Sequence, residues 1–255
     1  NPVYRYCKRY DLHEAQGFSL GCARSLFIGI ISNFIISCAP SERLNVSQST
    51  GHPWYWAHGN RTVLLLGASD DDNLFQWSED DLNNQLDRLV RVGGNFIRNT
   101  MSDRKEVGFE VYPFHEIQEG IYDLNEWNED YWIRFERLLV ETEKRDIVVQ
   151  IDIWDHYDFT GSNNFSEEGH WQAHPYNPKN NINYDLDESS FVVSYPVGQS
   201  TNNHSFFLTT PDQNNNVLVL KYQERFVHKI LDYTLDYNHV LYCVNSETNG
   251  GLKWY

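Results

Sequence analysis

Polar residues follow short apolar runs at several points of the sequence, and their types could do chemistry. Residues 240–244 form a run rich in strand-forming side chains that leads into Asn245, Ser246 and Glu247. The loops that follow parallel strands meet at one edge of a sheet, where they are free to carry functional groups. Glu247 is therefore a candidate proton donor. The alternative is a polar turn residue without a chemical role.

An earlier strand is expected to carry a basic group to the same edge. Residues 95–100 form this strand, which carries Arg98 and Asn99. Arg98 would hold a neighbouring carboxyl group in its charged form, because a positive charge favours the carboxylate. Its alternative is a salt-bridged arginine at the rim of the core.

The strand expected at 147–153 exits into Trp154, Asp155 and His156. His156 could hydrogen-bond the hydroxyl groups of a substrate, and its alternative is a structural histidine. Trp154 at the strand exit and Trp171 farther along are candidate platforms for sugar rings, although large aromatic side chains usually belong to the core.

Three consecutive acidic residues, Asp70, Asp71 and Asp72, follow the first expected strand at 63–66. Hard cations take oxygen ligands, which makes a metal site one interpretation of this loop. The spacing fits no calcium-binding loop, so we expect a solvated polar loop without a metal, in which Asp70 contacts substrate. No cofactor is expected elsewhere.

Helical periodicity separates the expected strands. Leucines three or four residues apart share one face of a helix between Ser78 and Gly93, and further helices are expected near 128–144 and 219–237. The turn dipeptide Gly59-Asn60 indicates an N-terminal hairpin, and the long polar region 159–216 reads as a packed lid. Regular alternation of strand and helix predicts an α/β fold with four right-handed βαβ units and a parallel sheet.

The composition limits the partners. Acidic residues outnumber basic ones by 36 to 20, for a net charge of -16, and such a surface repels the phosphates of nucleic acid. The four cysteines show no paired spacing, which argues against a disulfide framework and a zinc site. With 8 Trp, 16 Tyr and 14 Phe, the chain has aromatic rings for a core and for packing against sugars.

The N-terminal part has the features of an export signal. Residues 1–24 have no periodicity and remain unassigned, and 25–38 pair a basic residue with an apolar run that fits a secretory signal. Its end, Ile35-Ile36-Ser37-Cys38, resembles a bacterial lipobox, in which Cys38 is lipidated. The alternative is a buried helix. With 39–51 as a tether, we expect export to the bacterial envelope or periplasm and membrane contact only through this anchor.

Residues 52–255 resemble the N-terminal half of a retaining glycoside hydrolase of the (β/α)8-barrel clan that includes cellulases and mannanases, especially its bacterial apiosidase-like and cellulase-like branches. Residues 94–98 are similar to the second-strand motif, whose arginine supports the nucleophile. Residues 151–156 are similar to the third-strand motif, which ends in a substrate-site histidine. The resemblance implies a truncated barrel of four βα units, preceded by the hairpin, and a carbohydrate substrate.

The fourth-strand motif of that clan ends in Asn-Glu, with the glutamate as acid/base. In this sequence Ser246 precedes Glu247 and Asn245 lies one residue earlier, which puts in doubt the asparagine that binds the sugar 2-hydroxyl. Retaining hydrolysis also needs a second carboxylate about 5 Å from the first. The resemblance puts that nucleophile on a seventh strand, so we expect the sequence to be a fragment that is inactive alone.

Two other classes of function remain open. A non-catalytic glycan-binding surface lipoprotein would use the same aromatic and polar residues, and the Asn-Ser-Glu departure favours it. A barrel polysaccharide lyase or metal-dependent hydrolase is the other, because a fold does not determine chemistry.

Lipidation of Cys38 is directly testable. Expression in a bacterium that processes lipoproteins should give a membrane-associated form labelled by a palmitate analogue, because the lipobox cysteine carries the acyl chains. Cys38→Ala should abolish the label, whereas Cys22→Ala, the matched control, should keep it. Unchanged labelling of Cys38→Ala would exclude the anchor.

Overall fold

The computed structural model describes residues 46–58, 61–101, 108–155, 157–159, 170–193, 204–246 and 253–254. These residues belong to one compact unit, Glu42–Tyr255. They form a mixed α/β structure, as expected. Three of the candidate site residues, Cys38, His156 and Glu247, lie outside the described residues, as do the turn dipeptide Gly59-Asn60 and residues 1–38, which include the expected export signal.

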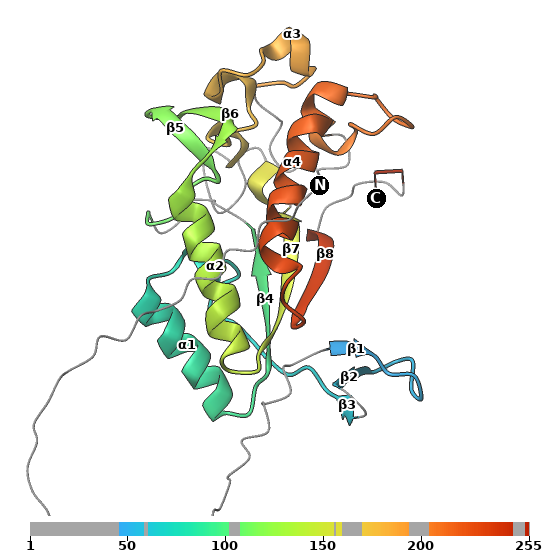
Figure 1. Ribbon diagram of the computed structural model, residues 1–255. Helices are drawn as coiled ribbons and strands as arrows, with labels where there is room; N and C mark the ends of the chain where they lie inside the picture. Colours follow the sequence, from blue (N-terminus) through green and yellow to red (C-terminus); the bar gives the residue numbers. More distant parts are fainter. Residues whose placement is uncertain are drawn as a thin grey trace, which may run out of the picture. The chain divides into compact units, whose positions relative to one another are not determined.

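A three-stranded parallel sheet forms the centre of this unit (Figure 1). Its strands are β4 (Phe96–Thr100), β7 (Val148–Asp155) and β8 (Val240–Ser246), in the order β4-β7-β8. The register sets Thr100 beside Asp152, and Asp152 beside Cys243. The strands expected at 95–100, 147–153 and 240–244 are therefore confirmed.

The three long helices also begin and end close to the expected residues. They are α1 (Glu79–Arg91), α2 (Glu129–Glu143) and α4 (Val217–Thr234). The side-chain oxygen of Ser78 accepts a hydrogen bond from the Asp81 N–H and so caps α1, and Gly93 follows the helix with a φ of 84°. Asn128 and Asn216 cap α2 and α4 in the same way.

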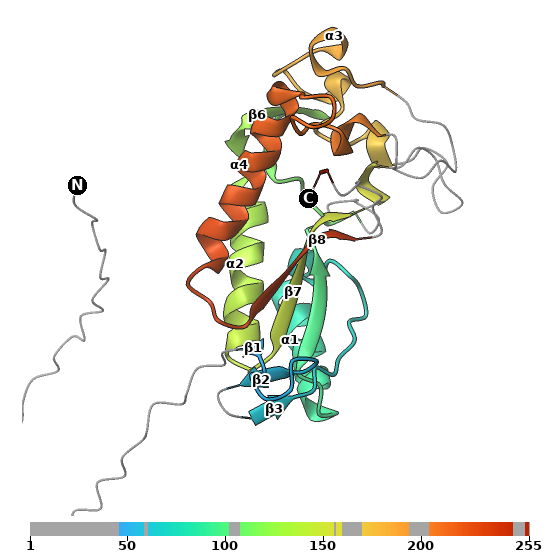
Figure 2. The same ribbon diagram turned by 90° about the vertical axis from the view of Figure 1, so that its right-hand side faces the viewer.

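Helices α2 and α4 lie on the same side of the parallel sheet (Figure 2). The side chains of Ile97, Val149 and Ile151 are buried within the core. Because side chains alternate between the two faces of a strand, Arg98, Gln150 and Asp152 belong to the opposite face. The sheet therefore has one apolar face under helices and one face with polar groups.

The prediction of a first parallel strand at 63–66 is wrong. Arg61–Val63 is β3 of a separate antiparallel sheet, with β1 (Val46–Gln48) and β2 (Trp56–His58), which confirms the hairpin. Residues 64–67 form no strand. Their hydrogen bonds to the segment that leads into β4 are made by one residue, Asn95. Asn95 donates its backbone N–H to the Leu66 carbonyl at 2.7 Å and accepts the Leu66 N–H on its side-chain oxygen at 2.8 Å.

This pairing explains why the prediction fails. An asparagine side chain replaces a rung of the strand ladder, and Leu64 and Leu66 are 63% and 52% exposed, so this stretch lacks the two-sided burial of a central strand. The part of the chain that the structure describes thus has three parallel strands rather than four, and no closed barrel is seen in it.

A hairpin between β4 and α2 was not expected. It consists of β5 (Phe114–Gln118) and β6 (Ile121–Trp127), joined by a turn in which Gly120 has a φ of 71°. Its alternation is irregular, because the β5–β6 register shifts twice. An isolated bridge from Tyr122 to Asn181 joins β6 to the long polar region.

The described part of the polar region is packed against the rest of the unit through aromatic side chains. Phe159 and Phe206 stack with ring centroids 4.1 Å apart, and the Tyr176 hydroxyl donates to the carbonyl of Tyr222 on α4. Its short helices are η2 (Tyr157–Phe159), η3 (His170–Gln172), η4 (Pro178–Asn180), α3 (Leu186–Ser189) and η6 (Ser205–Phe207); η1 (Leu74–Gln76) precedes α1. No helix of the described ranges is both long and apolar enough to cross a bilayer.

Buried histidines should make the stability of this unit depend on pH. Burial, and secondarily the positive charge of His170, lowers the pKa of His174 from 6.5 to about 3. Unfolding then takes up a proton below pH 6.5, so the stabilisation is complete above pH 6.5 and is lost as the pH falls towards 3. The slope for one such proton is about 1.4 kcal/mol per pH unit.

Urea unfolding of His174→Asn between pH 7.5 and pH 5 measures this contribution. An asparagine oxygen can still accept the Tyr176 N–H, which the His174 Nδ1 accepts at 3.2 Å, so the local turn should survive. The variant should lose stability less steeply on acidification than the natural protein. His115→Asn, at an exposed position of β5, is the control and should leave the slope as it was. An unchanged slope in His174→Asn would contradict the assignment.

Candidate functional site

An arginine and two aspartates form an ion-pair cluster on the polar face of the parallel sheet. The Arg98 Nε lies 3.5 Å from an Asp152 carboxylate oxygen, and its Nη2 lies 3.7 Å from Asp72. Arg98 comes from β4, Asp152 from β7, and Asp72 from the acidic loop that precedes η1. The Arg98 side chain is 45% exposed, whereas that of Asp152 is 2% exposed. One side of the guanidinium is thus anchored and the other side is open.

The Asp152 carboxyl is held by groups from its own strand and from both neighbours. Gln150 donates its amide to one oxygen at 2.8 Å, and the side chains of Cys243 and Ser246 lie near enough to favour the charged form of the carboxyl. Burial raises the pKa of Asp152, while the Gln150 hydrogen bond and the Arg98 charge act in the opposite direction. This carboxyl therefore exchanges its proton closer to neutral pH than an exposed aspartate does.

The thiol of Cys243 belongs to the same network. Its sulfur donates to the Asn245 carbonyl, with the two atoms 3.0 Å apart. Burial raises the pKa of this thiol, and the negative charge of Asp152 raises it further. Cys243 is therefore held in its protonated form, in which it donates a hydrogen bond.

The end of β8 carries two of the residues expected at the site. Asn245 lies in register with Trp154, and Ser246 with Asp155. The Asn245 side-chain oxygen and nitrogen are both buried, and neither has a hydrogen-bond partner in the part of the chain that the structure describes. Unpaired buried amides are rare, because each lost hydrogen bond costs about 1–3 kcal/mol. Asn245 thus retains unused donors and acceptors at this strand end.

Three other expected contacts are engaged in packing or in local hydrogen bonds. Asn99 is fully buried, and its side-chain oxygen accepts the Phe75 N–H at 3.1 Å, which ties η1 to β4. Trp154 is 5% exposed and Trp171 is fully buried, and the Trp171 indole donates to a backbone carbonyl. Both tryptophan rings are core members in this structure.

The two remaining aspartates differ in their surroundings. Asp155, at the end of β7, is 3% exposed, so its carboxyl faces protein rather than solvent. Asp70 is exposed, in the loop before η1. Among the described residues, no group of three or more His, Cys, Asp or Glu side chains could hold a metal ion.

Asp152 and Gln150 are site residues that the sequence reasoning missed. The signal that could have found them is their alternation: they are two polar residues, two positions apart, in a strand that is otherwise apolar up to its last residue, Asp155. Such a pair puts two polar side chains on one face of a central strand, where they need partners.

Comparisons with known proteins add little to this geometry. No family model matches the chain, and no curated protein matches it. One solved structure that resembles it in part is described as "a putative glycoside hydrolase from Bacteroides vulgatus", with 11% sequence identity and a TM-score of 0.41. That match covers 80% of this chain and 38% of the other, so this chain spans well under half of that protein. A likeness of this size decides neither fold nor function.

The Arg98–Asp152 contact predicts a measurable change in titration. Arg98→Gln should raise the pKa of Asp152 further, because the charge that favours the carboxylate is removed while the burial remains. Carboxyl carbon chemical shifts of Asp152, followed by NMR across the titration and assigned with Asp152→Asn, would measure it. Arg91→Gln, at an exposed position of α1, is the control and should leave the titration of Asp152 unchanged. A pKa that stays constant in Arg98→Gln would show that the two groups are not coupled.

Proposed function

We propose that the chain is part of a glycoside hydrolase that cleaves a poly- or oligosaccharide with retention of configuration. The observation that carries the proposal is the ion-pair cluster of Arg98 and Asp152 on the polar face of the parallel sheet, with Ser246 near enough to the same carboxyl to favour its charged form. Glu247 follows Ser246 directly in the sequence. An acid, an arginine and unused amide groups at strand ends suit the protonation and binding of a glycoside.

In this proposal Glu247 protonates the leaving-group oxygen and later activates water. A second carboxylate attacks the anomeric carbon to form a glycosyl–enzyme intermediate, and we propose that it comes from chain beyond these 255 residues. The open side of the Arg98 guanidinium would hold that carboxylate ionised. Asp152 would fix the other side of the same guanidinium, which makes it a positioning residue.

Asn245 and His156 are the proposed contacts to substrate hydroxyl groups. The unpaired amide of Asn245 supports this role, since an amide both donates to and accepts from a hydroxyl. Asp70, exposed in the acidic loop, remains a candidate for an outer contact. No cofactor takes part in the proposed reaction.

A second candidate function is non-catalytic glycan binding. Ser246 stands where the hydrolases that this sequence resembles have an asparagine, and its side chain lies near the Asp152 carboxyl within the protein. A chain that binds sugar without cleaving it would keep the polar face and lose the pairing of acid and nucleophile. For either function we also propose export, with membrane contact only through a lipid on Cys38.

Kinetics of a Glu247→Ala variant in the longer protein proposed above test the proposal. Substrates with poor leaving groups should be cleaved about 10²–10⁴-fold more slowly, because they need the proton that Glu247 supplies. Activated aryl glycosides should lose far less, and azide should partly restore their turnover. Glu119→Ala, in the β5–β6 turn, is the control and should retain full activity.

Two results would count against this role. An equal loss on both substrate types without rescue by azide would remove Glu247 as acid/base. Sugar binding without hydrolysis by the unmodified longer protein would favour the non-catalytic alternative. The 255-residue chain alone should bind sugar without hydrolysing it, because an acid without its nucleophile cannot form the intermediate.

A further inference from the structure

A cavity of about 600 Å³ lies between the end of η1 and the first half of α2. Its volume falls in the range of about 300–1,000 Å³ that small-molecule sites occupy. Helix α2 lies on the side of the parallel sheet that α4 also covers (Figure 2). The lining of the cavity includes neither Arg98 nor Asp152, so this cavity is separate from the candidate site above.

Two aromatic residues are among those that line the cavity. Phe109 is 38% exposed, and Trp77 is partly buried against the core. The Trp77 indole nitrogen donates to an Asp71 carboxylate oxygen at 3.3 Å, which fixes the orientation of its ring. A fixed indole and an accessible phenyl ring offer flat apolar surfaces to a ligand.

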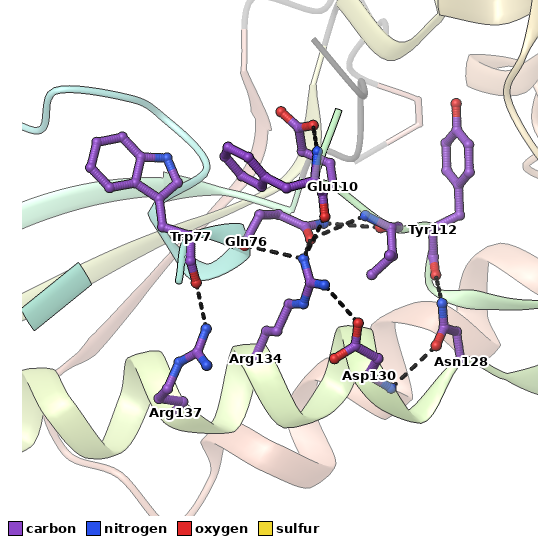
Figure 3. Close-up of polar contacts among 10 residues, drawn as sticks. Gln76, Trp77, Glu110, Tyr112, Asn128, Asp130, Arg134 and Arg137 are labelled. Carbon is purple, nitrogen blue, oxygen red and sulfur yellow. Dashed lines mark hydrogen bonds and ion pairs between the residues drawn. The ribbon is translucent and has the colours of Figure 1, made fainter. Parts of the chain in front are cut away.

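Arg134 gives the cavity a rigid wall. Its Nη1 donates to the Phe109 carbonyl at 2.7 Å and to the Gln76 carbonyl at 3.1 Å, and its Nη2 donates to Asp130 at 2.7 Å (Figure 3). These bonds join α2 to η1 and to the chain that precedes β5. The side chain of Arg134 is 19% exposed, so this frame is largely shielded from water.

Arg137 is held less completely. Its Nη2 donates to the Trp77 carbonyl at 2.5 Å, and Figure 3 shows it reaching from α2 towards that residue. Its Nε is buried without a hydrogen-bond partner, and it forms no ion pair within the described ranges. A guanidinium has five N–H donors, so Arg137 retains several for a ligand.

Unused acceptors line the same cavity. Asp81 accepts the Ser78 hydroxyl on one oxygen at 2.6 Å, and Asp130 accepts Arg134 on one oxygen. The second oxygen of each carboxylate has no hydrogen bond to the described part of the protein. The lining thus combines free donors, free acceptors and aromatic faces.

The charges of the lining indicate what would bind. Two arginines and two aspartates balance, so an anion meets the carboxylates and a cation meets the guanidinium groups. A hydroxyl group both donates and accepts, and therefore fits unused groups of both kinds. We propose that this cavity is a second binding site for a neutral, hydroxyl-rich ring: a sugar whose C–H face packs on Trp77 and Phe109. Binding at this site does not depend on the hydrolysis proposed above.

Indole ¹⁵N NMR of the full chain provides a reading specific to this site. The protein has eight tryptophans, and the Trp77 cross-peak is the one that disappears in Trp77→Phe. Titration with cellobiose and with mannobiose should move this cross-peak for at least one of the two sugars. Glucuronate and putrescine, as anionic and cationic probes, should leave it in place.

Substitutions of residues that line the cavity then test their contribution to binding. Phe109→Ala should weaken the binding seen at the Trp77 cross-peak about tenfold, because it removes one stacking surface. Asp81→Ala should weaken this binding by a similar factor. Asp81 is exposed, and its backbone N–H still donates to the Ser78 hydroxyl in the variant, so α1 keeps its cap. This variant therefore tests the proposal even if Phe109→Ala does not fold. Tyr55→Ala, which removes a 52% exposed ring elsewhere, is the matched control and should not change the affinity.

The proposal is overturned if the Trp77 cross-peak moves with neither sugar, or moves only with a charged probe. It is equally overturned if Tyr55→Ala weakens binding as much as Phe109→Ala and Asp81→Ala do. Loss of hydrolysis in the Glu247→Ala variant with an unchanged response of Trp77 would leave this site intact and separate the two proposals.

Discussion

The buried carboxyl of Asp152 is the interaction on which the polar face of the sheet depends. It lies in the middle strand and accepts a hydrogen bond from Gln150 on its own strand, while Cys243 and Ser246 of β8 lie near it and Arg98 approaches from β4. A buried carboxylate without partners is strongly unfavourable, so these contacts require the three strands to keep their register. A shift of one residue would move Arg98 to the apolar face.

The two helices α2 and α4 cover the same face of the sheet, and this has a direct chemical consequence. Helices α2 and α4 bury the apolar side chains of one face, and this packing holds the strands in place. The opposite face carries an arginine that is 45% exposed beside a carboxyl that is 2% exposed. Nε of this guanidinium faces Asp152 and Nη2 faces Asp72, so its exposed part is what remains for a further anion. The Arg98 side chain is therefore held in place by the protein and still exposes part of its positive charge.

Local patterns in the sequence predict most of the elements but not all of their partners. The helices follow from leucine spacing and from capping residues such as Ser78, and three parallel strands follow from short apolar runs. The strand at 63–66 fails because an asparagine side chain replaces a backbone pairing, which no local pattern encodes. Whether Trp154 and Trp171 are buried or exposed also depends on residues distant in the sequence, because these residues pack against each ring.

Both candidate sites contain contacts that link residues far apart in the sequence, and this limits what the sequence can reveal. Arg134 bonds to Gln76, 58 positions earlier, so the cavity beside α2 has no signature in either segment alone. Asp152 differs, because its polar character within an apolar strand is visible locally. A buried polar residue in a central strand needs a partner from a neighbouring strand, and Arg98, at the same edge, is the positively charged residue expected there. The Arg98–Asp152 pair could therefore have been predicted from the sequence, whereas the cavity can be recognised only in the folded structure.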